Sequence, residues 1–184
     1  MNYVIVDLEA TCWDQRNQNR QEIIEIGAVL IDDAKNIVSE FERFVKPITH
    51  PKLSPFCTEL TSITQEDVDQ ADYFPEVVAD FKQWFNEESK EYVLCSWGFY
   101  DRKQFELDCE LHGLDTLWLA QHISLKHQHG KIKGLRRNLG MKRALAEEGL
   151  KLDGTHHRGI DDARNIAKIF LKNFDHWNIS EVKK

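Results

Sequence analysis

The first apolar run of the sequence, residues 3–10, is the feature that most constrains the fold. A run rich in β-branched residues is typical of a buried strand, yet this one ends with Asp7 and Glu9. Because side chains two apart on a strand share one face, both carboxylates point the same way from a hydrophobic platform. Two such charges repel each other and resist desolvation. The sequence therefore leaves two interpretations: a divalent-metal site for Mg²⁺ or Mn²⁺, or a frayed strand with hydrated carboxylates.

Length and composition predict one domain, residues 1–184. The 184 residues, of which 41% are hydrophobic, are enough to bury a substantial core. No apolar stretch is long enough to span a bilayer, and the N-terminus lacks the features of a signal peptide. We therefore expect a soluble, cytoplasmic protein with no membrane partner. The absence of a Cys-x-x-Cys pair predicts reduced, partly buried thiols at Cys12, Cys57, Cys95 and Cys109.

The net charge of −7 argues against a protein that coats nucleic acid by bulk electrostatics. The charge is unevenly distributed along the chain. Residues 126–143, which we call the basic stripe, hold seven lysines or arginines and no acid, whereas the rest has 17 basic and 31 acidic residues. The histidines and glycines of the basic stripe are typical of a mobile loop that meets phosphates. A solvated surface without a partner is the alternative.

Hydrophobic patterning predicts an α/β fold. Residues 22–31 and 37–45 are expected to form two strands that are antiparallel with the first and are joined by a turn. Residues 92–97 are predicted to form a strand buried on both faces, followed by a helix over 101–112. Further helices are expected after Thr64, from Pro75, over 141–148 and over 160–174. This order indicates a mixed sheet flanked by helices.

Two further carboxylates are expected near the first pair. Asp101 follows a strand and begins a helix, so it either faces the site from the rim of the sheet or serves as the helix N-cap. In the last helix, Asp162 shares a stripe with apolar residues and is predicted to face inward, where it requires a cation or strong donors. A wholly polar stripe of the same helix, predicted to face water, consists of Asp161, Asn165, Lys168 and Lys172.

Histidine spacing gives a candidate general base but not a unique one. His156 stands five residues before Asp161, and the same spacing separates His157 from Asp162. The phase of the helix favours His157, and a histidine near neutral pKa can take a proton from a catalytic water. A surface histidine without a role is the alternative. A zinc site is a further interpretation, although no cysteine accompanies its candidate ligands His122, His127 and His129.

Three separated motifs together resemble those of the DEDDh exonucleases, in the DnaQ-like group of the RNase H-like fold. They are Asp-x-Glu on the first strand, an Asp where a central strand meets a helix, and His-x-x-x-x-Asp opening a late helix. Within this group the sequence is most similar to the Eri-type 3′-to-5′ exoribonucleases, in segments 7–13 (DLEATCW), 22–29 (EIIEIGAV), 56–64 (FCTELTSIT) and 157–167 (HRGIDDARNIA). The resemblance implies an RNase H-like mixed five-stranded sheet, an antiparallel hairpin plus parallel strands, flanked by helices.

The resemblance also implies a site and a reaction. It assigns metal ligation to the carboxylates Asp7, Glu9, Asp101 and Asp162 and the general-base role to His157. Two divalent metal ions, Mg²⁺ or Mn²⁺, would bind the scissile phosphate at the 3′ end of a single-stranded nucleic acid, with RNA preferred. The product would be a nucleoside 5′-monophosphate. Substrate contacts are expected from Ala10, Thr11, Trp97, Tyr100, Arg136 and Arg137.

Some alternatives stay open within this resemblance. Gly98-Phe99-Tyr100 before Asp101 departs from the family pattern, so either Trp97 or Tyr100 is the aromatic that stacks on the terminal base. The same site would also suit a DNA-directed or short-oligonucleotide exonuclease. A catalytically silent RNA-binding module on this fold is the non-enzymatic alternative, although all five candidate residues are present. Selectivity for a particular RNA would come from a partner or from the basic stripe, because the catalytic fold uses the whole chain.

Overall fold

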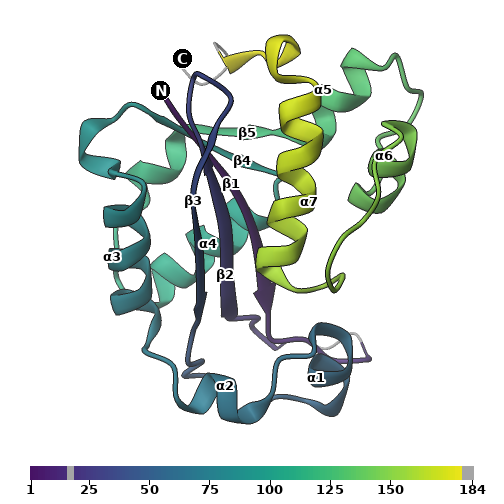
Figure 1. The fold of residues 1–184 in the computed structure, drawn as a ribbon. Coiled ribbons are helices and arrows are strands. Elements are labelled where there is room, and N and C mark those ends of the chain that lie inside the picture. Colours follow the sequence, from purple (N-terminus) through teal and green to yellow (C-terminus); the bar gives the residue numbers. More distant parts are fainter. Residues whose placement is uncertain (16–18, 180–184) are drawn as a thin grey trace.

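The central element of the protein is a mixed five-stranded sheet (Figure 1). The structure, a computed structural model, describes residues 1–15 and 19–179, so residues 16–18 and 180–184 of the predicted domain lie outside the described part. The strands run across the sheet in the order β3-β2-β1-β4-β5. Their bounds are β1 Asn2–Ala10, β2 Ile23–Ile31, β3 Ile37–Phe44, β4 Tyr92–Ser96 and β5 His122–Ser124. The predicted α/β class with a mixed sheet is confirmed.

Strand β1 lies between the antiparallel and the parallel half of the sheet. It pairs antiparallel with β2 and parallel with β4, while β3 extends the antiparallel side and β5 the parallel side. Tyr3 and Ile5 of β1 belong to the hydrophobic core on one face, and the alternate residues Val4, Val6 and Leu8 to the core on the other. Because side chains alternate along a strand, Asp7 and Glu9 continue the face of Tyr3 and Ile5.

Seven helices flank the sheet within the described residues. Helices α3 and α4 pack on one face, and α7 crosses β1 and β2 on the other (Figure 1). The helices are α1 Pro55–Thr61, α2 Gln65–Asp69, α3 Phe74–Trp84, α4 Tyr100–Leu111, α5 Leu125–Ile132, α6 Met141–Glu147 and α7 Gly159–Lys172. None of the helices in residues 1–15 and 19–179 has the length and apolar character needed to cross a bilayer.

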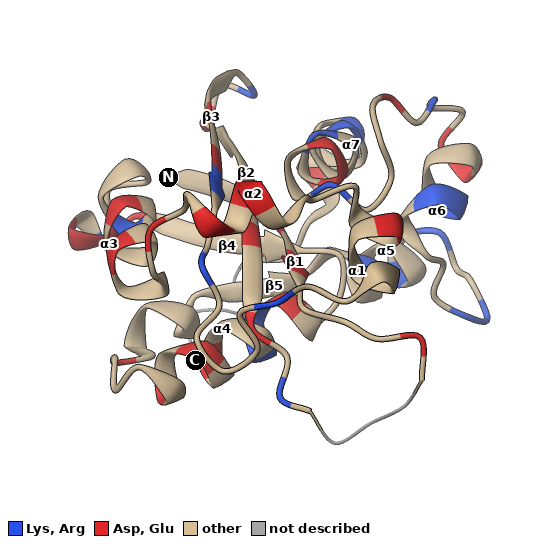
Figure 2. Ribbon diagram, turned by 90° about the horizontal axis from the view of Figure 1, so that it is seen from below, with Lys and Arg blue, Asp and Glu red and all other residues tan. Residues whose placement is uncertain are grey.

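The first half of the basic stripe folds into α5, so the prediction of a mobile loop is wrong there. His129 of α5 is fully buried, with its Nε2 atom 2.9 Å from Oε1 of Glu148. The Nζ atom of Lys133 lies 2.9 Å from the same oxygen. The sequence of the stripe does not reveal this helix because Glu148, which anchors it, lies outside the stripe. Lys and Arg residues nevertheless gather around α6 and the segment before it, apart from the acidic α2 and α3 (Figure 2).

Helix α7 confirms the inward position of Asp162 but corrects the prediction for its polar stripe. Asp162 is buried, and Asn165, which was expected to face water, is buried completely. The side-chain amide of Asn165 accepts a hydrogen bond from the backbone N–H of Asp153 at 3.0 Å and donates one to its carbonyl at 2.8 Å. The loop before α7 therefore folds back over the polar stripe. Periodicity within one helix cannot show a cover contributed by a neighbouring segment.

The start of α7 touches β2 at Gly27. A Cβ atom at position 27 would lie 2.1 Å from the backbone C of Gly159 and 2.1 Å from the backbone N of Ile160. Only glycine allows the two backbones to come this close. A Cβ atom at Gly159 would in turn lie 3.1 Å from the carbonyl oxygen of Asp7. The contact therefore brings the first turn of α7 beside the acidic end of β1.

Replacing Gly27 with alanine is expected to lower the free energy of unfolding by about 1–3 kcal/mol, because the opposing backbone atoms cannot move aside as a flexible side chain does. Gly140→Ala is the matched control. Nothing lies within 4 Å of a Cβ atom there, and its φ of −66° suits alanine. Its stability should change by less than about 0.5 kcal/mol. Chemical denaturation compares the two variants, and equal stabilities would contradict the close contact at Gly27.

Candidate active site

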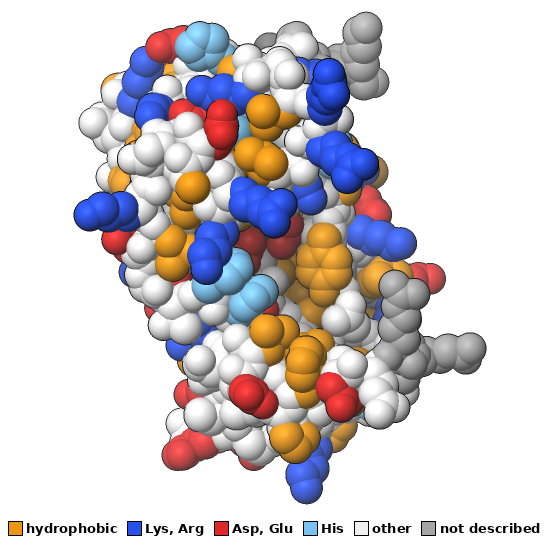
Figure 3. Space-filling model, turned by 90° about the vertical axis from the view of Figure 1, so that its right-hand side faces the viewer, with side chains coloured by type: hydrophobic (Ala, Val, Ile, Leu, Met, Phe, Trp, Pro, Cys, Tyr) orange, Lys and Arg blue, Asp and Glu red, His pale blue; other side chains and the backbone are white. Residues whose placement is uncertain are grey.

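Four carboxylates from three elements line one pocket with a volume of about 280 Å³. Asp7 and Glu9 come from β1, Asp101 from α4 and Asp162 from α7. One carboxylate oxygen from each of Asp7, Glu9 and Asp162 lies within 4.8 Å of the other two. Figure 3 shows acidic side chains recessed in the surface, with histidine at the border and Lys and Arg side chains around the recess. The structure thus brings together the four acids that the sequence singles out.

Asp101 is held by the backbone of β1 and does not cap its own helix. It is the second residue of α4, whose N-cap is Phe99, so the N-cap interpretation of Asp101 is wrong. The Oδ1 atom of Asp101 accepts a hydrogen bond from the backbone N–H of Leu8 at 3.2 Å. Leu8 stands between Asp7 and Glu9, so this bond fixes Asp101 beside both. A buried side chain of this kind is positioned by the sheet, which keeps the three carboxylates in register.

Burial and neighbouring carboxylates raise the pKa of acids in the pocket above their usual range. Burial, followed by repulsion from Asp101 and Glu9, raises the pKa of Asp7 well above its usual range. Burial and repulsion from Glu25 raise the pKa of Glu9 to about 8, and burial raises that of Asp101 to about 6. No lysine or arginine is among the described residues that line the pocket. Asp7, Glu9 and Asp101 can therefore all ionise near neutral pH only beside a cation that the described lining does not supply.

The donor set of the pocket fits hard divalent metal ions. It offers carboxylate oxygens, with the imidazoles of His156 and His157 at the border. Oxygen ligands in this number are typical of Mg²⁺ or Mn²⁺ sites. The alternative of a frayed strand is wrong, because β1 continues through Ala10 and the Glu9 side chain is only 9% exposed. Asp101 and Asp162 are likewise buried and Asp7 is half-buried, so the acids lie in a recess and not on a frayed end.

The two histidines before α7 make different contacts with Asp162. The Nδ1 atom of His156 lies 2.9 Å from Oδ2 of Asp162, so this imidazole donates to the carboxylate. His157 donates its backbone N–H to the same oxygen at 3.0 Å. The two rings stack with their centroids 4.0 Å apart, and His157 has a φ of 67°, which is uncommon outside glycine. Burial and the neighbouring His156 lower the pKa of His157, which favours its neutral form.

Spacing in the sequence does not distinguish His156 from His157 as the general base. Their contacts in the structure differ. His156 is engaged by the carboxylate of Asp162 through its ring, whereas His157 reaches that carboxylate only through its backbone. The imidazole of His157 lines the pocket, and no hydrogen bond from its ring to another described residue is present. A general base requires an imidazole nitrogen that is open to the substrate water. His157 as base stays a prediction that this geometry supports.

The two aromatic candidates for base stacking both line the pocket. The side chain of Tyr100 is 48% exposed, and its hydroxyl donates a hydrogen bond to Oε1 of Gln21 at 3.3 Å. Trp97 is half-buried, and its indole N–H donates to the carbonyl oxygen of Leu139 at 3.0 Å. Tyr100 thus presents more of its ring to a ligand. Trp97 ties the pocket to the segment that follows α5.

The other predicted substrate contacts lie outside the pocket lining. Ala10 and Thr11 are buried, and the Thr11 hydroxyl accepts a hydrogen bond from the backbone N–H of Glu22 at 3.0 Å. Arg136 and Arg137 are exposed in the segment between α5 and α6. Their contacts with substrate stay predictions. Ala10 and Thr11, next to the acids in the sequence, help to join β1 to the start of β2. Their position in the sequence does not reveal this structural role.

The zinc interpretation of the other histidines is wrong. Among the described residues, His122, His127 and His129 do not converge on one metal position. The ring of His122 lies 2.9 Å from Oγ of Ser96, and that of His127 lies 2.6 Å from Oγ of Ser124. His129 is paired with Glu148, as described above. The three side chains thus have separate structural partners.

Sequence reasoning assigned no role to Glu25, which lies at the edge of the site. Glu25 is fully buried in β2 and stands directly opposite Glu9 in the sheet. The available signal was a lone acid inside an otherwise apolar strand, because a buried charge requires a partner. The sequence identified the segment only as part of the resemblance. The structure shows which residues compensate this charge.

Without metal, the protein is expected to lose stability as the pH rises from about 4 to about 8. The pKa values of Glu9 and Asp101 are raised to about 8 and about 6 in the folded state. In this window the unfolded state binds fewer protons, so the free energy of unfolding falls by up to about 1.4 kcal/mol per pH unit for each such group. Thermal melting in chelator across this range measures the loss, and Mn²⁺ should reverse most of it.

Asp7→Asn should flatten this pH dependence and remove the stabilisation by Mn²⁺, because it removes one of the repelling charges and one oxygen ligand. Glu59→Gln, which changes an exposed acid on α1, should leave both unchanged. Two outcomes would contradict the assignment of these carboxylates as a metal site. One is a stability of the metal-free protein that rises with pH through this window, and the other is a melting temperature that Mn²⁺ does not change.

A family model described as Exonuclease matches residues 4–170. ERI1 exoribonuclease 2 of Homo sapiens is 32% identical over 192 residues, covering 92% of this chain and 28% of that relative. The 3′-5′ exoribonuclease 1 of Homo sapiens is 33% identical over 177 residues, covering 91% of this chain and 51% of that relative. The chain thus spans about half or less of the length of these curated relatives.

A solved structure agrees with the sequence matches. The nuclease domain of 3′hExo, a DEDDh family member bound to rAMP, superposes with a TM-score of 0.89 and 31% identity, covering 95% of this chain and 92% of that domain. The predicted RNase H-like fold is thereby confirmed. Divalent-metal dependence is general in this group. From its sequence, its fold and the convergence of four acids in one pocket, the chain belongs to the exonuclease family, among the DEDDh members related to the Eri-type exoribonucleases.

Proposed function

We propose that the protein is a metal-dependent exonuclease that shortens single-stranded RNA from its 3′ end and releases nucleoside 5′-monophosphates. The observation that carries this proposal is the convergence of Asp7, Glu9, Asp101, His157 and Asp162 in one pocket. The relatives named as 3′-5′ exoribonucleases and the rAMP bound to the 3′hExo nuclease domain support the same reaction and product. The completeness of the set disfavours a catalytically silent module.

The four carboxylates would hold two divalent ions, Mg²⁺ or Mn²⁺. When bound, such ions supply Lewis-acid stabilisation of the scissile phosphate and ease the ionisation of water. The chain contributes the fixed arrangement: Leu8 holds Asp101 beside β1, and the backbone of His157 holds Asp162. Rigid placement of the ligands before binding is what lets such a site act without further rearrangement.

His157 would take the proton of the attacking water. Its imidazole faces the pocket, and its nitrogens are not used by the contacts that engage His156. In this proposal His156 orients the Asp162 carboxylate through its Nδ1–H. The stacking of the two rings limits the rotation of His157. Two adjacent histidines thereby take different roles, one toward the acid and one toward the substrate.

Recognition of the nucleic acid would come from the rim of the pocket. The exposed ring of Tyr100 is the better placed candidate for stacking on the terminal base, with Trp97 as the alternative. The basic stripe, with Arg136 and Arg137 exposed, offers contacts for the phosphates that precede the 3′ end. Ala10 and Thr11 would act only through a local adjustment of β1.

Two further parts of the proposal concern the cellular compartment and the number of domains. Cys57, Cys95 and Cys109 are buried, Cys12 is partly buried, and all four are free, which supports a reducing, cytoplasmic compartment. The five strands of the described residues form one sheet, which supports a single exonuclease domain over 1–184. In this proposal any selectivity among RNAs comes from a partner or from the basic stripe.

Incubation with 5′-labelled RNA and Mg²⁺ or Mn²⁺ should yield a ladder that shortens from the 3′ end. Chelator should abolish the shortening, and Asp7→Asn should lower kcat by more than about a hundredfold, because a metal ligand is lost. Glu59→Gln is the control for changing an exposed acid that does not line the pocket. Single-stranded DNA of the same sequence should be shortened more slowly. Faster loss of DNA would favour the DNA-directed alternative, and no chelator-sensitive shortening of either polymer would defeat the enzyme proposal.

The two histidines should separate in a pH–rate comparison. His157→Ala is expected to lower kcat by about 10²–10⁴-fold and to remove the acid limb of the profile, because the group that accepts the proton is gone. His156→Ala should keep that limb and lose less than about tenfold. The reverse ranking of the two variants would reassign the base to His156.

A further inference from the structure

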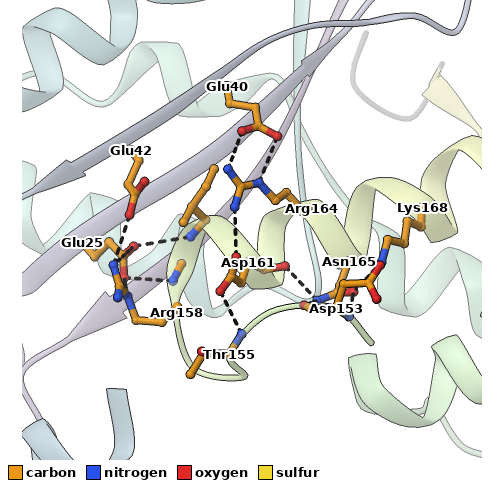
Figure 4. Close-up of polar contacts among 12 residues, drawn as sticks. Glu25, Glu40, Glu42, Asp153, Thr155, Arg158, Asp161, Arg164, Asn165 and Lys168 are labelled. Carbon is orange, nitrogen blue, oxygen red and sulfur yellow. Dashed lines mark hydrogen bonds and ion pairs between the residues drawn. The ribbon is translucent and has the colours of Figure 1, made fainter. Parts of the chain in front are cut away.

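The buried Glu25 carboxylate joins β2 to the segment that carries Asp162 and the histidines (Figure 4). Its Oε2 atom accepts a hydrogen bond from the backbone N–H of Gly159 at 2.9 Å and one from Nε of Arg158 at 3.2 Å. Its Oε1 atom accepts longer bonds, at 3.5 Å, from the backbone N–H of Ile160 and from Nη2 of Arg158. One side chain thus binds the N-cap residue and the first two residues of α7.

Glu25 differs from the four acids of the pocket in that the protein itself supplies its counter-charge. Arg158 and the first N–H groups of α7 surround its carboxylate, and the positive end of the helix dipole adds to them. It is not among the described residues that line the pocket, although Glu9 stands opposite it in the sheet. Glu25 is also absent from the groups of described side chains whose ligand atoms converge closely enough to hold one ion. A role as a fifth metal ligand is therefore not supported.

The residues that Glu25 binds are next to two of the catalytic candidates. His157 directly precedes Arg158, and Asp162 lies in the same first turn of α7 as Gly159 and Ile160. The glycine contact at Gly27 brings this turn against the sheet but supplies no directional bond. The Glu25 carboxylate orients the first turn of α7, because it accepts hydrogen bonds from two backbone N–H groups and a guanidinium at once.

We propose that Glu25 is a positioning residue, which fixes Asp162 and His157 against Asp7 and Glu9 by holding Arg158 and the first turn of α7. The proposal rests on the proposed function, because it takes Asp162 and His157 as members of the catalytic site. It assigns Glu25 no contact with substrate or metal.

A second, peripheral set of ion pairs provides a comparison on the same helix (Figure 4). Nη2 of Arg158 also donates to Oε1 of Glu42 at 3.1 Å, and Arg164 binds both carboxylate oxygens of Glu40. These acids lie on β3, and the side chain of Glu42 is 43% exposed, so water can replace it as a partner of Arg158. Glu42→Gln therefore removes one negative charge from the same arginine without touching the backbone of α7.

The decisive experiment measures Mn²⁺ binding by calorimetry in the absence of nucleic acid, together with kcat and KM on RNA, for the full chain. Glu25→Gln should raise the Mn²⁺ dissociation constant and lower kcat, each by about 10–100-fold, as found when partners that orient metal ligands are changed. KM should change by less than about threefold, because Glu25 touches no substrate. Glu42→Gln should leave all three values within about twofold of the wild type.

Arg158→Lys provides the second variant if Glu25→Gln does not fold. Lysine keeps the positive charge but lacks the fork that binds the carboxylate at two points, so the same losses are expected at smaller size. Unchanged Mn²⁺ affinity and kcat in a folded Glu25→Gln or Arg158→Lys protein would overturn the proposal. Equal losses in Glu42→Gln would also overturn it, because they would show a general effect of charge. Wild-type protein that binds Mn²⁺ but shortens no nucleic acid would defeat only the exonuclease function, since calorimetry still tests Glu25.

Discussion

The contact between the backbones of α7 and β2 at Gly27 is the constraint on which the candidate site depends. The strand fixes Asp7 and Glu9, but Asp162 and both histidines belong to a segment near the other end of the chain. They meet because α7 begins directly against the sheet, closer than any side chain at position 27 allows. Packing of apolar residues farther along α7, such as Ile166 and Phe170, holds the helix on this face. Its first turn is held in addition by the backbone contact at Gly27 and by the bonds to Glu25.

The recessed acids of the protein differ in whether a cationic side chain compensates their charge. Glu25 has its counter-charge within the chain, in Arg158 and the start of α7, and so contributes to structure without a ligand. The acids of the pocket have hydrogen-bond donors, Leu8 to Asp101 and His156 to Asp162, but no lysine or arginine in the described lining. Their repulsion is a cost to the metal-free fold that the two hydrophobic cores on either face of the sheet offset. A cluster left uncompensated by its own chain is a site for external cations.

Much of the fold and the acid set could be predicted because each rests on local patterns. Alternation in β1 and the phase of α7 place Asp7, Glu9 and Asp162 inward, and these patterns are set by the geometry of single elements. The predictions were wrong where contacts with a segment distant in the sequence determine the structure. Asn165 is covered by the loop at Asp153, and His129 of α5 is buried against Glu148, which lies beyond the basic stripe. The sequence shows Glu25 as a lone acid in an apolar strand but not its partners, since Arg158 and Gly159 lie far away in the sequence.

The distribution of charge also bears on the proposed binding of a nucleic acid. Outside the basic stripe the chain carries 17 basic and 31 acidic residues, so phosphates are repelled from most of the surface. Screening limits each charge to a range of about 8–10 Å at physiological salt, and local arrangement therefore matters more than net charge. Lys and Arg side chains surround the recessed acids, and they gather around α6 and the segment before it. In the proposed function, a nucleic acid that approaches along that side would bring its phosphates to the rim, and the acids would accept a phosphate only once cations have neutralised them. In the proposed reaction, metal binding and substrate binding would then be coupled, because each supplies the charge that the other requires.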